Sequence, residues 1–340
     1  MRATILAVDD ESDNLRIICD YLRQSNPDYR ILQAKNGKIA LKIVKKELPD
    51  LVLTDWNMPI MTGLELLNAI KSEEKCCDIP VIMQTANTED NHLKQAFDAG
   101  ATDYIKKPIS QVELLARVRS SLALSQAKQQ TEILLRNILP KEIADDLKTY
   151  GKTEAKHYEL VSVLFADFKG FTQIAEQLSP REIIENLNTC FLAFDEICER
   201  HHLEKIKTIG DAYMCAGGIP VENTSSPIDC TLAAFEMQNW MKTWQAEKEA
   251  KGEKAWELRL GIHSGPVVAG VIGKNKFAYD IWGSTVNLAA RMESSGVPGK
   301  INISGPTFEL IKHEFDCSYR GKVQVKNKGE VDMYFVEGIA

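Results

Sequence analysis

Several acidic residues follow short apolar runs near the start of the chain, where their side chains could act together. Asp9 and Asp10 close the run TILAV, and Asp55 closes DLVLT. Three carboxylates in one crevice repel each other unless a cation lies among them, and hard oxygen ligands suit Mg²⁺. A carboxylate beside Mg²⁺ can attack a phosphoryl group, because the metal offsets charge on both partners. Thr85 and Lys107 follow later runs and could each bind an oxygen of that group.

A second pair of acids lies in the C-terminal half. Asp167 ends the buried run in FADFKGFT, and Asp211 lies at the turn in TIGDAYM. Two strand-end carboxylates on adjacent strands can hold two divalent ions about 3.5–4 Å apart, which suits attack of a hydroxyl group on phosphorus. The FKGFT segment adds a glycine and a predicted helix start, whose free backbone N–H groups could bind phosphate.

An amide and a guanidinium occur together in the segment FAYDIWGSTVNLAARM. Asn287 and Arg291 are four positions apart, so they share one face of a predicted helix with Ser284 as its N-cap. Such a pair suits a ribose oxygen and a phosphoryl transition state. Either residue alone would be an ordinary exposed side chain, so this prediction depends on the acids that accompany it.

The N-terminal acids can act together only in a fold that brings strand ends together, and the sequence pattern of residues 1–124 predicts such a fold. Short apolar runs alternate with segments of helical length, which predicts a flavodoxin-like, doubly wound α/β domain with a parallel sheet. In such sheets ligands bind at the carboxyl ends of the strands, where Asp9, Asp10 and Asp55 fall.

A helical connector is predicted over residues 125–155, which lack strand signals and contain Pro140. The connector could form a short coiled coil, or it could pack as one amphipathic helix on a domain. Its apolar stripe consists of Ile133, Leu134, Ile138 and Leu139.

The C-terminal acids lie in a different pattern, over residues 156–340. Strands and helices follow in the order β-α-β-β-α-β, with a hairpin that turns at Gly210–Asp211. This order predicts a ferredoxin-like α+β domain. The chain should therefore contain two domains of different fold class joined by the connector.

The composition excludes several classes of protein. A chain of 340 residues with 44% hydrophobic and 26% charged residues suits a globular protein of two domains. The net charge of −7 argues against a general role in binding nucleic acid or a membrane surface. No apolar run approaches the roughly 18 residues of a membrane span, and the N-terminus does not read as a secretory signal. We therefore expect a cytoplasmic protein. The eight cysteines and six histidines show no spacing typical of a metal site or a disulfide scaffold.

The N-terminal motifs have a family resemblance. They are Asp9–Asp10, DWNMPIMTG from Asp55, Thr85 and Lys107–Pro108. Together they resemble the receiver domain of response regulators, over residues 1–124. The resemblance implies that Asp55 is the phosphoacceptor and that a sensor histidine kinase or a phosphotransfer protein is the partner. It also implies Mg²⁺ ligands at Asp9, Asp10 and the Asn57 carbonyl, and a switch formed by Thr85, Tyr104 and Lys107.

The C-terminal motifs resemble another family. FADFKGFT, EKIKTIGDAYM, LRLGIHSGPVVAGVIG and YDIWGSTVNLAARM look like the catalytic domain of class III nucleotidyl cyclases, over roughly residues 158–338. The resemblance implies two Mg²⁺ or Mn²⁺ ions per site, bound by Asp167, Asp211 and the Phe168 carbonyl. It implies that Asn287 orients the ribose and that Arg291 stabilises the transition state. It further implies triphosphate contacts at Arg259 and Lys326.

Base choice can be read from two side chains. Adenine presents an acceptor at N1 and an amine donor at N6. Lys207, just before TIGD, is a donor, and Asp280, just before IWG, is an acceptor. In the cyclase family that this chain resembles, the pair marks adenylate cyclases, whereas guanylate cyclases have Glu and Cys. We therefore expect conversion of ATP to 3′,5′-cyclic AMP and pyrophosphate.

The resemblance also implies a homodimer. The family forms its sites at a head-to-tail interface between two subunits, and one chain here carries both sets of residues. Phosphorylation of Asp55 is expected to regulate the rate through the dimer geometry. The alternatives are a guanylate cyclase, or a phosphorylation-dependent binding module with an idle cyclase fold. A diguanylate cyclase is excluded because its Gly-Gly-Asp-Glu-Phe signature is absent.

Overall fold

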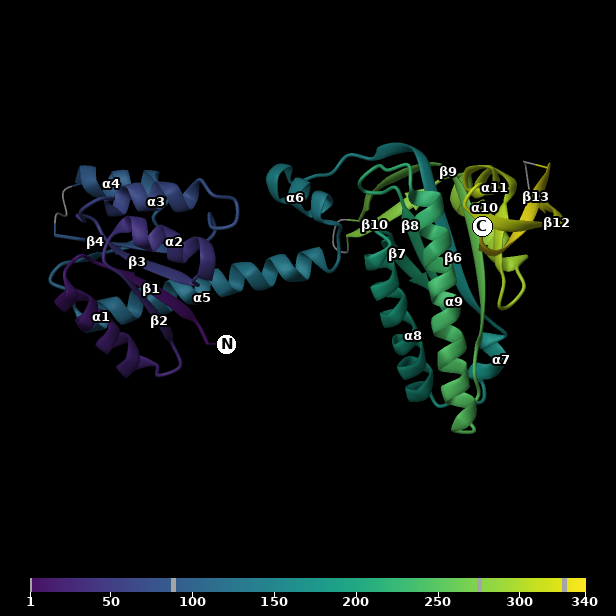
Figure 1. The fold of residues 1–340 in the computed structure, drawn as a ribbon, viewed down its shortest axis with the longest axis horizontal. Helices are drawn as coiled ribbons and strands as arrows, with labels where there is room; N and C mark the ends of the chain where they lie inside the picture. Colours follow the sequence, from purple (N-terminus) through teal and green to yellow (C-terminus); the bar gives the residue numbers. More distant parts are fainter. Residues whose placement is uncertain (1, 87–89, 274–276, 326–328) are drawn as a thin grey trace. The chain divides into compact units, whose positions relative to one another are not determined.

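The computed structural model of the protein describes residues 2–86, 90–273, 277–325 and 329–340. It divides the chain into two compact units, Met1–Leu134 and Leu135–Ala340 (Figure 1). We call these the N-terminal unit and the C-terminal unit. The boundary falls within residues 125–155, so the first part of the predicted connector belongs to one unit and the rest to the other.

The N-terminal unit is an alternation of strands and helices. Local sequence fixes several helix starts: Thr62 and Glu65 form a reciprocal capping box at α3, and the Asn36 side chain accepts from the Ile39 N–H at α2. The elements are β1 (Thr4–Val8), α1 (Ser12–Ser25), β2 (Arg30–Ala34), α2 (Gly37–Glu47), β3 (Leu51–Asp55), α3 (Gly63–Lys71), β4 (Val81–Thr85), α4 (Asp90–Asp98), β5 (Asp103–Lys106) and α5 (Gln111–Arg136).

The strands of this unit form one parallel sheet in the order β2-β1-β3-β4-β5. Every residue of β3 and β4 is buried, as expected for a parallel sheet with helices on both faces. Alternate residues feed two apolar clusters, one with Leu6 and Val52 and the other with Ile5 and Leu51. The predicted doubly wound fold is confirmed.

The C-terminal unit is a mixed α+β fold. Ser179 and Glu182 form a capping box at the start of α8, with Pro180 in the first turn. The elements are α6 (Lys141–Tyr150), β6 (Lys156–Lys169), α7 (Phe171–Ala175), α8 (Pro180–Arg200), β7 (Glu204–Ile209), β8 (Ala212–Gly217), α9 (Ser226–Ala250), β9 (Glu257–Ile272), β10 (Ala278–Trp282), α10 (Ser284–Ser294), β11 (Ile301–Ser304), α11 (Gly305–Ile311), β12 (Phe315–Val325) and β13 (Gly329–Ile339).

The sheet of this unit runs β12-β13-β11-β9-β6-β8-β7, and β10 pairs with β9. The central strands β9-β6-β8-β7, with α8 and α9, have the order and connections of a ferredoxin-like core. The predicted hairpin is present, since Ile209 pairs with Ala212 across the turn at Gly210–Asp211. The α+β prediction is therefore confirmed.

Each face of this sheet has its own apolar cluster. Leu164 and Tyr213 point toward the cluster that α8 and α9 cover, and Figure 1 shows these two helices side by side. Phe165 and Met214 point toward the opposite cluster, which also contains Leu139, just before α6, and Ala144 within α6. Thus the second part of the predicted connector is a packed element of the C-terminal unit.

Candidate functional site

The N-terminal acids meet at the carboxyl ends of neighbouring strands. β1 and β3 lie side by side in register, so Asp9 and Asp55 emerge at the same edge of the sheet. Carboxylate oxygens of Asp9, Asp10 and Asp55 lie within 4.8 Å of one another. This oxygen-only donor set fits a hard divalent cation such as Mg²⁺.

Lys107 joins two of these acids. Its Nζ lies 2.9 Å from Asp9 Oδ2 and 2.8 Å from Asp55 Oδ1. Burial raises the pKa of the Asp55 carboxyl group, and the hydrogen bond from Lys107 partly offsets this effect. For Lys107 burial lowers the pKa, but the bonds to Asp55 and Asp9 outweigh it and the pKa is raised. A charged ammonium group therefore offsets part of the negative charge of the acids.

The other predicted residues of this edge are placed as follows. Asn57 is exposed two residues after Asp55. Thr85 is 3% exposed at the end of β4. Tyr104 in β5 is half-buried, and the Arg117 guanidinium lies 5.2 Å from its ring centroid. These contacts of Tyr104 are those of a packed side chain, so its role in a switch stays a prediction.

One glycine that the sequence reading did not single out supports this edge. A Cβ atom on Gly63 would lie 2.1 Å from the Asp55 carbonyl oxygen, far inside van der Waals contact. The segment from Asp55 to Gly63 therefore folds back tightly, and the Gly63 N–H donates to the Trp56 carbonyl at 2.9 Å. Close approach of the backbone explains why a residue without a side chain ends the motif.

The C-terminal acids also meet. Asp167 lies near the end of β6, and Asp211 lies in the turn between β7 and β8, of which β8 is a neighbour of β6 in the sheet. Burial raises the pKa of Asp211, and the negative charge of Asp167 raises it further. Phe168 follows Asp167 and is 2% exposed, so its side chain lies in the core. Two interacting carboxylates are a donor set that fits divalent cations.

Arg259 bridges this acid pair to a residue that the sequence reading missed. Arg259 is opposite Asp167 in the register of β9 and β6, and its Nη2 lies 2.5 Å from Asp167 Oδ2. The same Nη2 lies 2.9 Å from Glu293 Oε1. Burial, and then the charge of Asp167, raise the pKa of Glu293 to about 7. Arg259 Nε is buried and has no hydrogen-bond partner among the described residues, so it is a donor that the surrounding protein leaves unsatisfied.

Glu293 had no signal of its own in the sequence, since a glutamate near a helix end is usually solvated. In the structure, the residue that allows Glu293 to approach Arg259 is Gly261, two residues after Arg259. A Cβ atom there would lie 1.9 Å from the Glu293 backbone nitrogen. The backbones of β9 and α10 therefore touch at this point, which brings the Glu293 side chain beside Arg259.

The two residues predicted to read the base form an ion pair. The Lys207 Nζ on β7 donates to Asp280 Oδ2 on β10. The second carboxylate oxygen of Asp280 accepts from the Ile281 N–H at 2.9 Å. A donor and an acceptor thus lie side by side at a half-buried position of the C-terminal unit.

Asn287 and Arg291 are both exposed on α10. The prediction that Ser284 caps this helix is wrong: Gly283 is the N-cap, and Ser284 is the first helical residue. Gly283 has φ of 148°, a conformation that a side chain rarely adopts, so glycine sets the start of the helix. The predicted triphosphate contact Lys326 lies outside the described residues.

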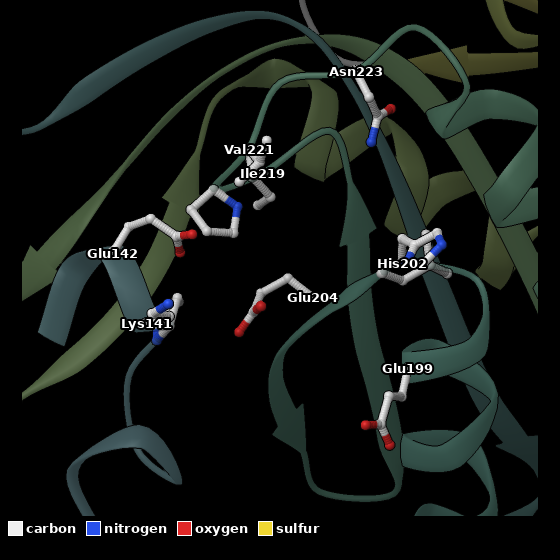
Figure 2. Close-up of a pocket in the computed structure, with 11 residues that line it drawn as sticks. Lys141, Glu142, Glu199, His202, Glu204, Ile219, Val221 and Asn223 are labelled. Carbon is white, nitrogen blue, oxygen red and sulfur yellow. The ribbon is translucent and has the colours of Figure 1, made fainter. Parts of the chain in front are cut away.

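A cavity of about 490 Å³ lies elsewhere in the C-terminal unit, beside the start of α6 (Figure 2). Its described walls include none of the predicted site residues. Figure 2 shows the Glu142 and Glu204 side chains extending toward each other across it. Burial, and then the charge of Glu142, raise the pKa of Glu204 to about 7.

Comparison with known families gives two matches. Residues 5–119 match the response regulator receiver domain, and residues 153–338 match the adenylate and guanylate cyclase catalytic domain. Within the described residues, no helix has both the length and the apolar character needed to cross a membrane.

Individual relatives include cyclases of both base preferences. The chain is 37% identical to an adenylate cyclase of Mycobacterium tuberculosis, covering 65% of this chain and 49% of that protein. It is 38% identical to human guanylyl cyclase C, covering 59% of this chain and 19% of that protein. One similar solved structure is the catalytic core of a rhodopsin-guanylyl cyclase with converted specificity, in complex with ATPαS. It is 36% identical to this chain with a TM-score of 0.51, and the match covers 55% of this chain and 99% of that one. The chain thus spans half or less of the length of these curated relatives.

Proposed function

The chain belongs to the adenylate and guanylate cyclase catalytic domain family and also carries a response regulator receiver domain, and from this membership we propose that it is an adenylate cyclase controlled by phosphorylation. It converts ATP to 3′,5′-cyclic AMP and pyrophosphate. It acts in the cytoplasm as a homodimer, with a sensor histidine kinase or a phosphotransfer protein as its partner.

The observation that carries the choice of ATP is the ion pair between Lys207 and Asp280. An ammonium can donate to N1 of adenine, and a carboxylate can accept from the N6 amine. Guanine has a donor at N1 and an acceptor at O6, so both contacts would be mismatched. The pair is preformed, which lowers the entropic cost of binding the base. A guanylate cyclase is the alternative, because relatives of both kinds match.

The acids of the site would hold divalent metal ions. Asp167, Asp211 and the Phe168 carbonyl are the proposed ligands for two Mg²⁺ or Mn²⁺ ions. When bound, the metals lower the pKa of the ribose 3′-hydroxyl group and neutralise the triphosphate. Arg259, and Lys326 by family resemblance, contact the triphosphate. The unpartnered Nε of Arg259 supports this role, because a phosphate oxygen would satisfy it.

The remaining groups orient the substrate. The Asn287 amide holds the ribose, so that the 3′-oxygen is in line with the α-phosphorus and the bond to pyrophosphate. The Arg291 guanidinium donates to the phosphoryl oxygens, on which negative charge builds in the transition state. Both side chains are exposed on α10, and Glu293 on the same helix is buried toward Asp167. This arrangement supports a dimer in which α10 of one subunit completes the site of the other.

Control is proposed to begin at Asp55, the phosphoacceptor, with Mg²⁺ bound by Asp9, Asp10 and the Asn57 carbonyl. Thr85 and Lys107 would bind the new phosphoryl oxygens. Asp55 is only 7% exposed and contacts Lys107, so a change there must alter the packing of the strand ends.

The connector would transmit a change in the receiver domain to the C-terminal unit. Leu139 and Ala144 are buried in the same cluster as Tyr279 and Ile281. Those two residues flank Asp280 on β10. A movement of α6 would therefore shift the strand that carries one half of the base-reading pair, which supports regulation through this element.

Product identification tests the proposal. Purified protein is incubated with ATP or GTP and with Mg²⁺ or Mn²⁺, and products are identified by mass spectrometry. We expect cyclic AMP, with kcat/KM for ATP well above that for GTP. Cyclic GMP as the main product would support a guanylate cyclase, and no cyclic product under any condition would support a binding module with an idle cyclase fold.

A further inference from the structure

Glu293 is a buried acid that the proposed mechanism leaves without a role. It is 8% exposed, and it shares the Nη2 of Arg259 with Asp167, at 2.9 Å and 2.5 Å. A single guanidinium nitrogen therefore serves two carboxylates. One of them, Asp167, is needed elsewhere if it binds a metal ion.

The fold fixes Glu293 firmly in this place. Gly261 allows the backbone of β9 to touch that of α10 at Glu293, since a Cβ atom would lie 1.9 Å from the Glu293 nitrogen. Asn302 on β11, itself fully buried, donates from Nδ2 to the Met292 carbonyl at 2.7 Å. The last turn of α10 is thus bonded to one strand and packed on another, which holds the carboxylate close to Arg259.

We propose that Glu293 is a positioning residue that holds Arg259 in the triphosphate site when Asp167 turns from the guanidinium to a metal ion. This inference rests on the proposed function of the site. Glu293 itself need not touch substrate, and its effect is exerted through Arg259.

The physical reason is the partial burial of Arg259, whose side chain is 24% exposed. A guanidinium that loses its carboxylate partner in a buried site is strongly destabilised. Without Glu293, Arg259 would keep Asp167 as its only partner and compete with the metal ion for that carboxylate. With Glu293, one carboxylate can bind metal while the other stays paired with the guanidinium and keeps it oriented, so that it can donate from Nε and its other nitrogen to phosphate oxygens.

The test measures binding of magnesium pyrophosphate by calorimetry, alongside KM and kcat for ATP. Four variants form the comparison: Glu293→Gln, Glu293→Asp, Arg259→Ala and the double variant Glu293→Gln with Arg259→Ala. Loss of the carboxylate charge beside Arg259 is expected to weaken pyrophosphate binding about tenfold in Glu293→Gln. KM should rise by a similar factor, with a smaller change in kcat. Glu293→Asp should recover part of the loss, because it keeps the charge.

The double variant separates positioning from a structural role. If Glu293 acts through Arg259, Glu293→Gln should weaken binding no further in the Arg259→Ala background. Glu309→Gln is the matched control, since Glu309 is an exposed helical glutamate paired with Lys312 in the same unit. Equal weakening in both backgrounds, or none in either, would overturn the proposal, and circular dichroism checks that each variant is folded. If Glu293→Gln does not fold, Glu293→Asp must bind pyrophosphate more weakly than wild type, and equal binding would overturn the proposal.

The result is distinguishable from failure of the proposed function. A wild-type protein that binds magnesium pyrophosphate but forms no cyclic product would contradict the proposed function, and the variants would still test Glu293. A wild-type protein that does not bind magnesium pyrophosphate would overturn both.

Discussion

Lys207 and Asp280 are 73 positions apart in the sequence, yet the Lys207 ammonium donates to the Asp280 carboxylate between β7 and β10. The pair needs no substrate to form. Each partner lowers the cost of partly burying the other, so the two residues act as one unit in stability and in recognition. The effect of substituting one residue should therefore be compared with the effect of substituting both.

The base preference should follow this pair. Lys207→Glu combined with Asp280→Cys is expected to move the ratio of kcat/KM for ATP and GTP toward GTP. The change places an acceptor against the guanine N1–H and removes the carboxylate that would repel O6. Total activity should fall, because the surrounding contacts are not rebuilt. An unchanged ratio would mean that these residues do not read the base. Lys207→Glu alone should be less stable than the double variant, because the single change places a second carboxylate beside that of Asp280.

The metal assignment predicts loss of turnover without loss of fold. Asp167→Ala and Asp211→Ala should each reduce kcat by at least about a hundredfold, since several kcal/mol of charge stabilisation depend on the metals. Asp316→Ala, at an exposed position of β12, is the control and should retain activity. A chelator should likewise stop turnover by the wild type. Wild-type rates in either folded acid variant would remove these residues from the metal site.

Glu204 should make the stability of the C-terminal unit depend on pH. Its pKa is raised from 4.5 to about 7 in the folded protein. The folded state therefore holds more protons than the unfolded state between these values, so stability falls as pH rises from 4.5 to about 7 and then levels off. Glu204→Gln cannot ionise. It should be more stable than wild type at pH 8, by up to about 3 kcal/mol, with a smaller gain at pH 5.

This prediction is checked by thermal unfolding of the full chain, followed by tryptophan fluorescence. Glu159→Gln is the control, because the Glu159 side chain is 89% exposed. An equal gain for Glu204→Gln at both pH values would show that the gain does not come from ionisation. The signal reports mainly the C-terminal unit, which contains Trp240, Trp244, Trp256 and Trp282 of the five tryptophans.

Phosphorylation of Asp55 should change the rate of cyclic nucleotide formation, and we expect a rise. A phosphorylated receiver that pairs with a second copy would favour the dimer in which the site is complete. Displacement of Arg291 by about 1 Å can cost on the order of a hundredfold in rate, so small rotations suffice. Wild type, Asp55→Asn and the exposed control Asp28→Asn are compared with and without a phosphoryl donor or a beryllium fluoride mimic. Equal rates throughout, with phosphorylation of the wild type verified, would show that the units are not coupled.

Site residues could be predicted from the sequence where they directly follow a predicted strand or lie in a predicted turn. Asp9 and Asp55 could be placed together because parallel strands end at one edge, and the turn at Asp211 because a glycine marks it. Glu293 could not be predicted, because its burial depends on how closely β9 approaches α10. The boundary between the two units could not be predicted from the sequence either. Ile138 is exposed and its neighbour Leu139 is buried, and only the sheet that Leu139 meets decides which of them belongs to the core.

The most direct test of the central claim mixes two inactive variants. Asp167→Ala removes a proposed metal ligand, and Asn287→Ala removes a ribose contact that the partner subunit is proposed to supply. Each variant alone should be inactive. After subunit exchange, half of the dimers should be mixed, and each mixed dimer has one intact site, so the mixture should form cyclic AMP from ATP at about a quarter of the wild-type rate. No recovery, with subunit exchange confirmed by labelled chains, would contradict a site shared between two subunits.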